Sequence, residues 1–459
     1  MCKDGCCSHV PENAINMGNK LELFIDDHLI DTMSNARLLM HRPQPMPLPQ
    51  SPFTGSYMTV LKDGDLYRGY FRRYRPDFDG ERKDGNPGEC TCYTVSNDGI
   101  EWTEPELGLF EDDDCGGLKN AILCQAPFAH NFSPFVDTRP GIPAGERYKA
   151  LAGTRQSGLH AFASADAVRW TKMSDGPVIS YDETLHGRLA FDSQNVAFWS
   201  AVEQCYLSYF RHFNTPQGGL RTIARAVSAD FLHWTDQSAD FQAPNLPGEE
   251  LYTNQTHPYF RAPHIYLALP SRFTQGTVQG EPVEGNYGST DIMLMTSRAG
   301  SMAYQRTFKE AFIRPGPDPE RWKNRANYVA LNVVPTGPAE MSIYNRSGQR
   351  YVLRTDGFAS VNALYDGGGM VTRPVVFDGK ELILNAATSI RGGVRVELQD
   401  LGGNPLPGFG LDDCRPFLGD RIEHVFSWKD GSDLGAYSGT PVRLRFELKD
   451  CDLYSMRFR

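Results

Sequence analysis

The sequence predicts an all-β protein composed of a five-bladed β-propeller followed by a C-terminal β-sandwich. Three observations predict this fold: a short motif that recurs at even spacing, alternating apolar and polar residues around each copy, and a change of pattern after residue 352. The chain has 459 residues, of which 44 are glycine and 31 are proline. This abundance is expected where many turns connect short strands.

The recurring motif is Ser-x-Asp-x-x-x-Trp. Its aromatic residues are 68, 64 and 70 residues apart when a degenerate fourth copy, which ends in tyrosine, is included. Self-similarity at a fixed period is typical of repeat folds. The aspartate can bond the amides of a turn and the tryptophan can fill the gap between neighbouring sheets, so we expect a structural role. The copies are Ser96–Trp102, Ser164–Trp170, Ser228–Trp234 and Ser297–Tyr304.

The segment around each copy contains the strands of one blade. In the first unit, "SYMTVLKDGDLYRGYFRRY" is two alternating runs joined by Asp63-Gly64, a hairpin signal, and "CYTVSNDGIEWTEP" is the third strand with its turn. The same order recurs four more times, the last in a shorter form, and four strands in about 67 residues make one propeller blade. Five units predict five blades, and the early strand "LELFIDDHLID" is expected to close the ring.

The last part of the chain follows a different pattern. Segments such as "ELILNAAT" and "VRLRFELKD" alternate strictly between Gly, Asp and Pro turns, and no Trp motif recurs. This pattern predicts a β-sandwich that packs on the propeller, with sugar binding as an alternative role. The predicted organisation is a disordered N-terminus over 1–19, a propeller over 20–352 and a sandwich over 353–459.

Composition narrows the classes of function. The net charge of −10 argues against a nucleic-acid partner and gives no support for binding to anionic membranes. No apolar run is long enough to span a bilayer. The N-terminus lacks the apolar segment of a secretory signal, so a cytoplasmic protein is expected, or a mature form whose signal was removed. The ten cysteines show no metal-ligand spacing, so we expect neither a metal site nor a cofactor. The oligomeric state stays open.

These features resemble the invertase/levanase and arabinanase families of glycoside hydrolases. "LFIDDHLI", "FDSQNVAFW", "HPYFRAPHIYL" and "YVLRTDGF" also resemble a bacterial group labelled family-32-like. The resemblance covers nearly the whole chain at the level of the fold and implies hydrolysis of a carbohydrate. It is weaker at the site, because the invertase motifs Trp-x-Asn-Asp-Pro, Arg-Asp-Pro and Glu-Cys are absent. Asp26 and Asp27 are an imperfect echo of the first motif, and Asp192 of the second.

The geometry of a propeller selects candidate catalytic residues. Innermost strands begin at the mouth of the central channel, and Asp192 is the one carboxylate at such a predicted start, followed by polar Gln194 and Asn195. Glycosidic cleavage usually needs two carboxyl groups. The expected catalytic residues are therefore Asp192, Glu89 at the start of the third strand of the first blade, and Asp27 on the closing strand.

Other polar residues on the same face are candidates for substrate binding. His130 and His257 could also donate a proton, although a lone histidine is more often structural. The substrate-binding candidates are His130, Asn131, Gln194, Arg73, Arg211, His212, His257, Arg272 and Glu310.

Every predicted second strand ends in or near an arginine. Arginine binds carboxylate or sulfate in a bidentate manner, so these residues predict an anionic sugar. The alternative is that several of them pair with acidic residues in nearby loops, and we expect this for at least two of the five. The arginines are Arg73, Arg155, Arg211, Arg272 and Arg346.

Three functions fit these observations. The leading one is a glycoside hydrolase that acts on the end of an oligosaccharide or polysaccharide. The others are a non-catalytic carbohydrate-binding propeller, and a lyase or phosphorylase on the same fold. Two close carboxylates at the mouth would favour hydrolysis, whereas one carboxylate among histidines and arginines would favour the others.

Overall fold

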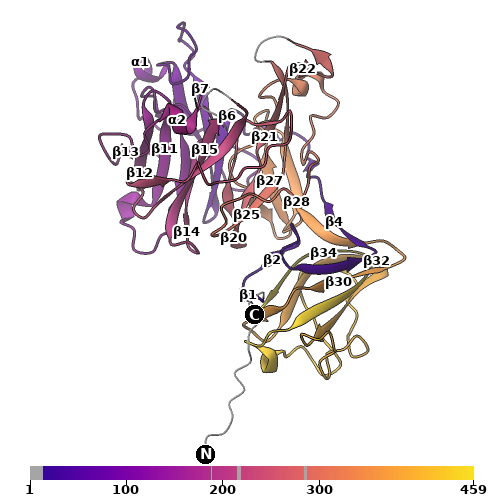
Figure 1. Ribbon diagram of the computed structural model, residues 1–459. Helices are drawn as coiled ribbons and strands as arrows, with labels where there is room; N and C mark the ends of the chain where they lie inside the picture. The colour runs from indigo at the N-terminus through magenta and orange to yellow at the C-terminus, as the bar shows by residue number, and fades with distance from the viewer. Residues whose placement is uncertain (1–13, 188, 214–218, 284–286) are drawn as a thin grey trace, which may run out of the picture. The chain divides into compact units, whose positions relative to one another are not determined.

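The protein is built almost entirely from β-strands (Figure 1). The computed structural model describes residues 14–187, 189–213, 219–283 and 287–459. In these ranges the α-helices are single turns, α1 (Asp112–Cys115) and α2 (Glu183–His186), and none is long and apolar enough to cross a membrane. The all-β prediction is therefore confirmed. The chain divides into two compact units, Pro43–Val352 and a second unit that combines Met1–Arg42 with Leu353–Arg459.

Among the described residues, the first unit contains four four-stranded sheets, two three-stranded sheets and one two-stranded hairpin, which we group along the chain as sheets 1 to 5. Sheets 1 to 3 each have four antiparallel strands, paired in sequence order. Sheet 1 is β6 (Ser56–Asp63), β7 (Leu66–Tyr74), β8 (Glu89–Ser96) and β9 (Ala121–Leu123); sheet 2 is β10 (Ser133–Val136), β11 (Tyr148–Thr154), β12 (Gly158–Ser164) and β13 (Thr171–Lys172); sheet 3 is β14 (Val196–Ser200), β15 (Cys205–Phe213), β16 (Arg221–Ser228) and β17 (Trp234–Asp236).

Sheets 4 and 5 depart from this plan. Sheet 4 is split into two three-stranded ladders, and sheet 5 takes its outermost strand, β5, from the segment that precedes sheet 1. The ladders of sheet 4 are β19 (His257–Tyr259), β20 (Ala262–Ala268) and β25 (Met295–Arg298), then β18 (Glu250–Leu251), β21 (Ser271–Gln275) and β24 (Gly288–Ile292), with β22 (Thr277–Val278) and β23 (Glu281–Pro282) as a small hairpin beside them; sheet 5 is β26 (Val334–Gly337), β27 (Glu340–Tyr344), β28 (Arg350–Arg354) and β5 (Gln44–Pro45).

The first strands of successive sheets contact one another. β6 contacts β10 and β26, and β14 contacts β10 and β19. Thr59 of β6 also bridges Leu331, just before β26. The Gln194 side chain donates to Thr59 Oγ1 at 3.0 Å, and Gln255 donates to the Gln194 side chain and to the Val329 carbonyl. These buried amides link sheets 1, 3, 4 and 5 near their first strands.

The Ser-x-Asp turn has the same structure in its first three copies. In the second copy, Ser164 Oγ accepts from the amide of Ala167, and Asp166 Oδ1 accepts from the amides of Val168 and Arg169. The fourth position has a left-handed backbone, with φ of 73° at Gly99, 69° at Ala167 and 73° at Phe231. Trp170 packs edge-on against Phe132 with ring centroids 4.9 Å apart. The motif therefore forms turns and plugs, as its residues predict.

The second unit is built around two long strands, β32 (Leu382–Gln399) and β34 (Arg443–Phe458), which pair along most of their length. β34 also pairs with strands from both ends of the chain, and β1 adds a short parallel pair with β31. The remaining strands are β1 (Ile15–Gly18), β2 (Glu22–Leu23), β3 (Ile30–Ser34), β4 (Ala36–Met40), β29 (Ala359–Ala363), β30 (Gly368–Thr372), β31 (Val375–Phe377) and β33 (Asp420–Val425).

The expectation that residues 21–31 close the first unit is wrong. β2 pairs with β34 and β3 with β30, and Phe24 and Leu29 are buried in the core of the second unit with Trp428 and Phe446. Apolar burial against this core decides where the segment pairs. Ile15–Gly18 likewise forms a strand, whereas the rest of the predicted disordered terminus, up to residue 13, lies outside the described residues.

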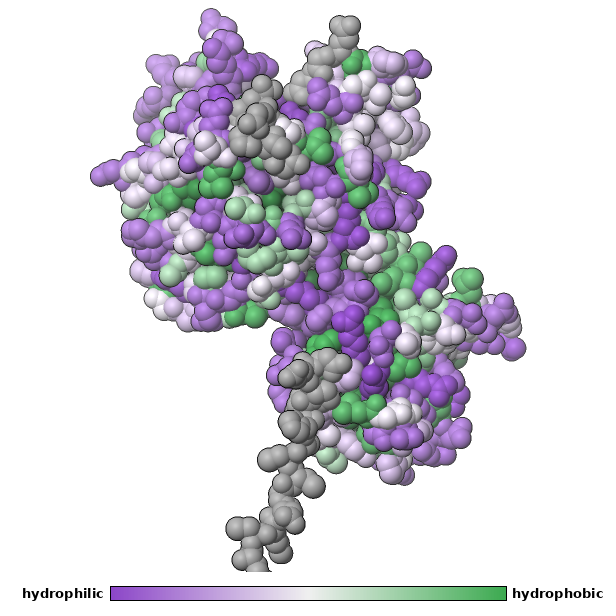
Figure 2. All heavy atoms as spheres, in the orientation of Figure 1, coloured by the Kyte–Doolittle hydropathy of each residue, from purple (hydrophilic) through white to green (hydrophobic). Residues whose placement is uncertain are grey.

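Apolar side chains form a separate core in each unit, while hydrophilic residues predominate on the face drawn in Figure 2. This partition is the ordinary outcome of removing apolar surface from water.

Candidate active site

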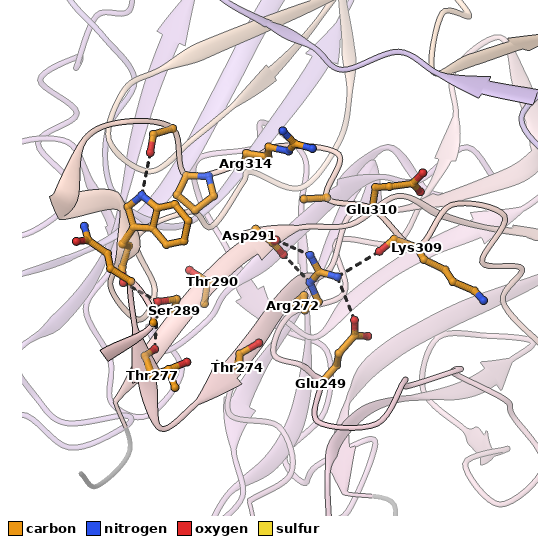
Figure 3. A pocket seen from close by; sticks show the side chains of 16 residues that line it. Glu249, Arg272, Thr274, Thr277, Ser289, Thr290, Asp291, Lys309, Glu310 and Arg314 are labelled. Atoms are coloured by element: carbon orange, nitrogen blue, oxygen red, sulfur yellow. Dashed lines mark hydrogen bonds and ion pairs between the residues drawn. The ribbon is translucent and has the colours of Figure 1, made fainter. Parts of the chain in front are cut away.

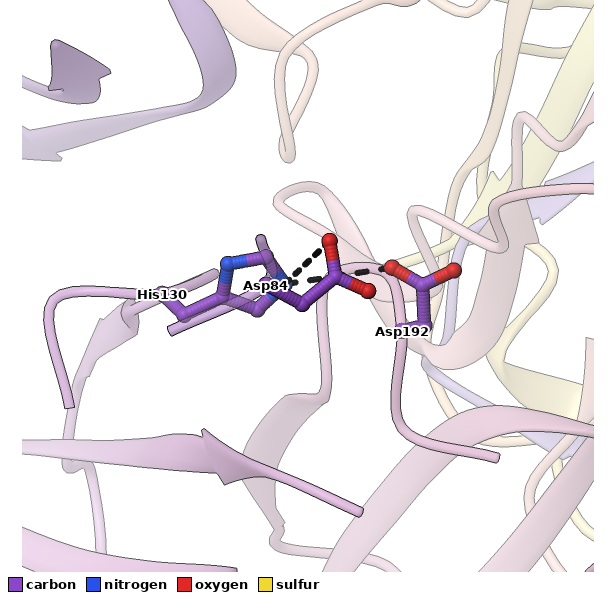
Figure 4. A group of neighbouring side chains, drawn as sticks. All are labelled: Asp84, His130 and Asp192. Carbon is purple, nitrogen blue, oxygen red and sulfur yellow. Dashed lines mark ion pairs between the residues drawn. The ribbon is translucent and has the colours of Figure 1, made fainter. Parts of the chain in front are cut away.

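Three side chains from three sheets meet in the first unit: Asp84, His130 and Asp192 (Figure 4). Asp84 lies in the loop between β7 and β8, whereas His130 precedes β10 and Asp192 precedes β14. One polar atom from each residue lies within 4.8 Å of the other two. They line a cavity of about 390 Å³, at the small end of the range of about 300–1,000 Å³ for ligand pockets.

Glu89 fixes the position of His130 from the buried side. It begins β8, is 1% exposed, and its Oε2 atom lies 2.8 Å from His130 Nδ1. The amide of Gly85 and the hydroxyl of Tyr74 also donate to Glu89, and Arg72 lies 3.1 Å away. With Nδ1 directed to Glu89, His130 turns Nε2 toward Asp192 Oδ1 at 3.8 Å.

Asp192 is held as a carboxylate. Its Oδ2 and its main-chain carbonyl accept from Arg211, which is buried against the ring of Tyr252 with its guanidinium carbon 4.6 Å from the ring centroid. Burial disfavours the charged carboxylate, but Arg211, His130 and Asp84 outweigh burial and hold the pKa of Asp192 well below its usual range. Asp192 remains 23% exposed, so its Oδ1 edge is open to the cavity.

Asp84 has the opposite protonation behaviour. The side chain of Asp84 is 55% exposed, but its partial burial at the cavity and the negative charge of Asp192 raise the pKa of Asp84 to about 6. His130 has a raised pKa because its bonds to Asp192 and Glu89 outweigh the cost of burial. The site therefore contains a carboxylic acid that keeps its proton up to about pH 6 beside a carboxylate that ionises readily, a split that assigns one group as acid and the other as base or nucleophile.

The same three residues offer ligand atoms to a metal ion. Two guanidinium groups surround them, because Arg211 pairs with Asp192 and Arg72 lies 3.1 Å from Glu89. Close positive charges oppose a dication, and the residues fit a shared proton better than a metal.

A second cavity of about 260 Å³ lies beside the first. Arg72 connects the two, because it lines the second cavity while its Nη1 atom contacts His130, which lines the first, and the neighbouring Asn131. Tyr57 has a left-handed backbone with φ of 51°, and its ring packs 4.6 Å below the guanidinium of Arg72. The cavity is lined by Ser56, Tyr57, Arg72, Tyr74, Arg82, Arg325, Tyr328 and Arg346.

The structure brings together five predicted site residues: Asp192, Glu89, His130, Asn131 and Arg211. Arg73 does not join this group, because successive side chains of a strand point to opposite faces. It points away from the cluster and pairs with Glu104 at 2.8 Å, while its neighbour Arg72 points inward. The sequence therefore identified the correct strand end but the wrong arginine.

Gln194, His257 and His212 are buried structural residues. Gln194 is 0% exposed and its amide bonds Thr59 and the Met58 carbonyl. His257 donates from Nδ1 to the Gln255 carbonyl at 2.8 Å and accepts at Nε2 from the Val333 amide. Burial lowers the pKa of His257 to about 4, and burial with nearby His186 does the same for His212. These residues hold the sheets together and do not line the Asp192 cavity.

Arg272 and Glu310 line a different and larger cavity, of about 830 Å³, beside β21 and β24 (Figure 3). Arg272 is held between Asp291 at 2.6 Å and Glu249 at 3.0 Å, as Figure 3 shows. These carboxylates neutralise the charge of Arg272. Pairing with acidic residues is the alternative to anion binding that the sequence left open for several of the arginines. Asp27 is an exposed turn residue in the second unit, so its placement on a closing strand of the first unit is wrong.

Sequence reasoning missed Asp84, Arg72 and Arg325. Asp84 lies in the charged loop "RPDFDGERKDGNPGE", where five acidic residues compete and no periodicity singles one out. Arg72 could have been found from the alternation of side chains along β7, which places residues 72 and 73 on opposite faces of the sheet.

No family model matches the sequence, and no curated protein matches it. Among solved structures, a family 43 arabinoxylan arabinofuranohydrolase from Bacillus subtilis, determined with cellotetraose, is 14% identical with a TM-score of 0.40, covering 89% of this chain and 96% of that chain. A family 32 β-fructofuranosidase from Bombyx mori is 9% identical with a TM-score of 0.43, covering 92% and 95%. Both families that the sequence resembles are represented. Likenesses this distant assign no activity.

Proposed function

We propose that this protein is a glycoside hydrolase that removes sugar units from the end of an oligosaccharide or polysaccharide. Asp84 is the general acid and Asp192 the nucleophile. The observation that carries the proposal is the pair itself: two carboxyl groups within 4.8 Å, one with a pKa raised to about 6 and the other with a pKa well below its usual range. Glycosidases require this division of roles.

The proposed scaffold is a closed five-bladed propeller with a C-terminal β-sandwich. The contacts of β6 with both β10 and β26 support closure, as does the Gln194–Gln255 link between sheets 3 and 4. β5 supports it further, because it adds an early strand to the outer edge of the last sheet. In such a ring the residues before β10 and β14, His130 and Asp192, lie at one end of the channel.

The proposed reaction has two steps. Asp84 gives its proton to the glycosidic oxygen, the bond from that oxygen to the anomeric carbon breaks, and Asp192 Oδ1 forms an ester with the carbon. Water then attacks the same carbon, Asp84 takes the proton from the water, and the ester bond to Asp192 breaks. Without substrate, the Asp84 proton is shared with Asp192. The glycosidic oxygen would replace Asp192 as its acceptor.

The spacing favours retention of configuration. Inverting enzymes keep their carboxyl groups about 6.5–9.5 Å apart to admit a water molecule, whereas retaining enzymes hold them about 5–5.5 Å apart. One oxygen atom of Asp84 lies within 4.8 Å of one of Asp192, which supports the shorter, retaining spacing. The small cavity supports action at a chain end, because it offers room for few sugar units.

A panel of oligosaccharides and aryl glycosides, neutral and charged, tests the proposal. We expect release of reducing sugar from at least one member. Asp84→Asn should lower turnover by at least about 100-fold, the lower range of acid catalysis. With Asp84→Asn, azide should restore cleavage of an activated glycoside and give a glycosyl azide of retained configuration. Unsaturated uronate products would instead identify a lyase, and binding without any cleavage would identify a carbohydrate-binding protein.

A further inference from the structure

The second cavity concentrates positive charge without a matching carboxylate. Arg72, Arg82, Arg325 and Arg346 line it, and none of the lining residues that the structure describes is acidic. Arg72 shares its charge with Glu89. Among the described residues, no carboxylate lies within ion-pair distance of Arg82, Arg325 or Arg346. This contrasts with the net charge of −10 and with cavity arginines such as Arg272 and Arg395, which are held by acids.

Hydroxyl groups complete the lining. Tyr328 is 4% exposed, and its buried hydroxyl has no hydrogen-bond partner among the described residues. A buried polar group without a partner is costly and points to a ligand that satisfies it. The Ser56 hydroxyl accepts from Arg346 at 3.5 Å, and Tyr57 packs against Tyr328 with ring centroids 5.7 Å apart.

The arginines are held in place from behind. Arg346 Nη1 donates to the Arg325 carbonyl at 3.1 Å, and Arg325 Nη2 donates to the Tyr252 hydroxyl at 3.2 Å. Burial, together with the charges of Arg325 and Arg72, lowers the pKa of Arg346. An anion between these groups would relieve their mutual repulsion, and guanidinium groups match the oxygen atoms of a carboxylate or sulfate in a bidentate manner.

We propose that this cavity binds the anionic substituent, a carboxylate or a sulfate ester, of the sugar unit that the Asp84–Asp192 pair cleaves. The inference rests on the proposed function, because Arg72 joins the cavity to His130 and thereby sets the anion beside the acid–nucleophile pair. Of the five arginines that the sequence predicted for this role, it keeps Arg346, and it adds Arg325 and Arg82 in place of Arg211 and Arg272. It also names the substrate class: uronic acid or sulfated glycosides.

The test compares three matched aryl glycosides of one sugar: the neutral hexoside, its uronate and its sulfate ester. For the wild type we expect kcat/KM for one charged member to exceed that for the neutral member by about 100-fold, as for charged hydrogen bonds formed only with the anion. Arg346→Ala and Arg325→Ala should each lower the ratio of kcat/KM for the charged member to kcat/KM for the neutral member by at least about 10-fold. Arg346→Lys should recover part of it. The preferred member distinguishes carboxylate from sulfate.

Arg73→Ala is the matched control, because Arg73 adjoins Arg72 in sequence but pairs outward with Glu104. The Arg73→Ala variant should keep the full preference for the charged glycoside over the neutral one. Binding of the free uronate or sulfated monosaccharide to Asp192→Asn, measured by calorimetry, separates this inference from the proposed function. If the protein binds the anion and Arg346→Ala abolishes this binding, the anion-binding role of the cavity is supported even if no glycoside is cleaved. Cleavage with equal rates on charged and neutral glycosides, unchanged by Arg346→Ala, overturns the cavity's role and leaves the hydrolase intact. Absence of anion binding in calorimetry overturns it as well.

Discussion

His130 Nδ1 lies 2.8 Å from Oε2 of Glu89, which is buried at the start of β8. This contact selects the ring orientation in which Nε2 faces the open edge of Asp192. Glu89 touches no open part of the cavity and is a positioning residue, although the sequence predicted it as catalytic. The contact therefore links the buried end of sheet 1 to the proposed nucleophile on sheet 3.

Glu89→Gln should keep the shape of this contact and remove its charge. Since Asp192 and Glu89 both raise the pKa of His130, the substitution should lower that pKa, and turnover should fall by at least about 10-fold as the Asp192 environment changes. Titration of the His130 ring by NMR measures the first effect and steady-state kinetics the second. An unchanged His130 pKa in the folded variant would contradict the role given to Glu89.

The pH dependence of the wild type follows from Asp84. Its pKa is raised to about 6, so the acid form that donates a proton is present below pH 6 and is lost as pH rises through 6. Asp192 stays ionised to well below its usual range, so kcat/KM should be high on the acidic side of 6 and fall above it. A dinitrophenyl glycoside needs no acid assistance to form the ester, so with it Asp84→Asn should keep kcat/KM without the decline near pH 6, whereas its kcat falls because water is no longer activated. A decline near 6 in that variant would assign it to another group.

Arg211 should stabilise the fold through Asp192. Breaking a buried ion pair by removing one partner lowers the free energy of unfolding by about 3–5 kcal/mol. Because Asp192 is partly exposed, we expect the loss for Arg211→Ala at neutral pH to be at the lower end, about 3 kcal/mol. The pKa of Asp192 is depressed in the folded state, so the pair's contribution is present above its usual pKa and is lost as pH falls. Denaturant unfolding should show the gap between variant and wild type narrowing toward low pH. Arg73→Ala, an exposed pair, should cost no more than about 1 kcal/mol. Equal losses for both would contradict the assigned role of Arg211.

Metal removal should leave activity unchanged. One polar atom each of Asp84, His130 and Asp192 lies close enough to the others to bind a cation. Positive charge is already present there, because Arg211 pairs with Asp192 and Arg72 lies beside Glu89. Dialysis against a chelator followed by assay in metal-free buffer should give the same kcat and melting temperature. Recovery of a lost rate by one added divalent ion would show that the cluster is a metal centre.

The repeating fold was predictable because its signal is local. Ser164, Asp166 and Trp170 make their turn within seven residues, so the motif encodes the structure directly. The strand pairing of residues 21–31 was not predictable in this way. The apolar pattern around Phe24 and Leu29 is compatible with either unit of the structure. Only the long-range pairing of this segment with β34 and β30 assigns it to the second unit.

The candidate site was predictable where a residue stands at a strand start, as Asp192 and His130 do. It was not predictable where loop geometry brings a residue in, as for Asp84, or where strand alternation selects between neighbours, as for Arg72 and Arg73. His257 and Gln194 occupy predicted strand starts as well, but they are buried and bond to residues of neighbouring sheets. Burial separates these two groups, and a sequence without an alignment gives little information about burial.

Turnover by Asp192→Asn tests the central claim most directly. Asparagine keeps the size of the side chain and its acceptor for Arg211 but cannot form the ester with an anomeric carbon. We predict that the variant keeps a folded circular dichroism spectrum and loses at least about 100-fold in kcat on the substrate found in the panel, including activated aryl glycosides that Asp84→Asn still cleaves. A folded Asp192→Asn protein that turns over within a few-fold of the wild type would contradict the account.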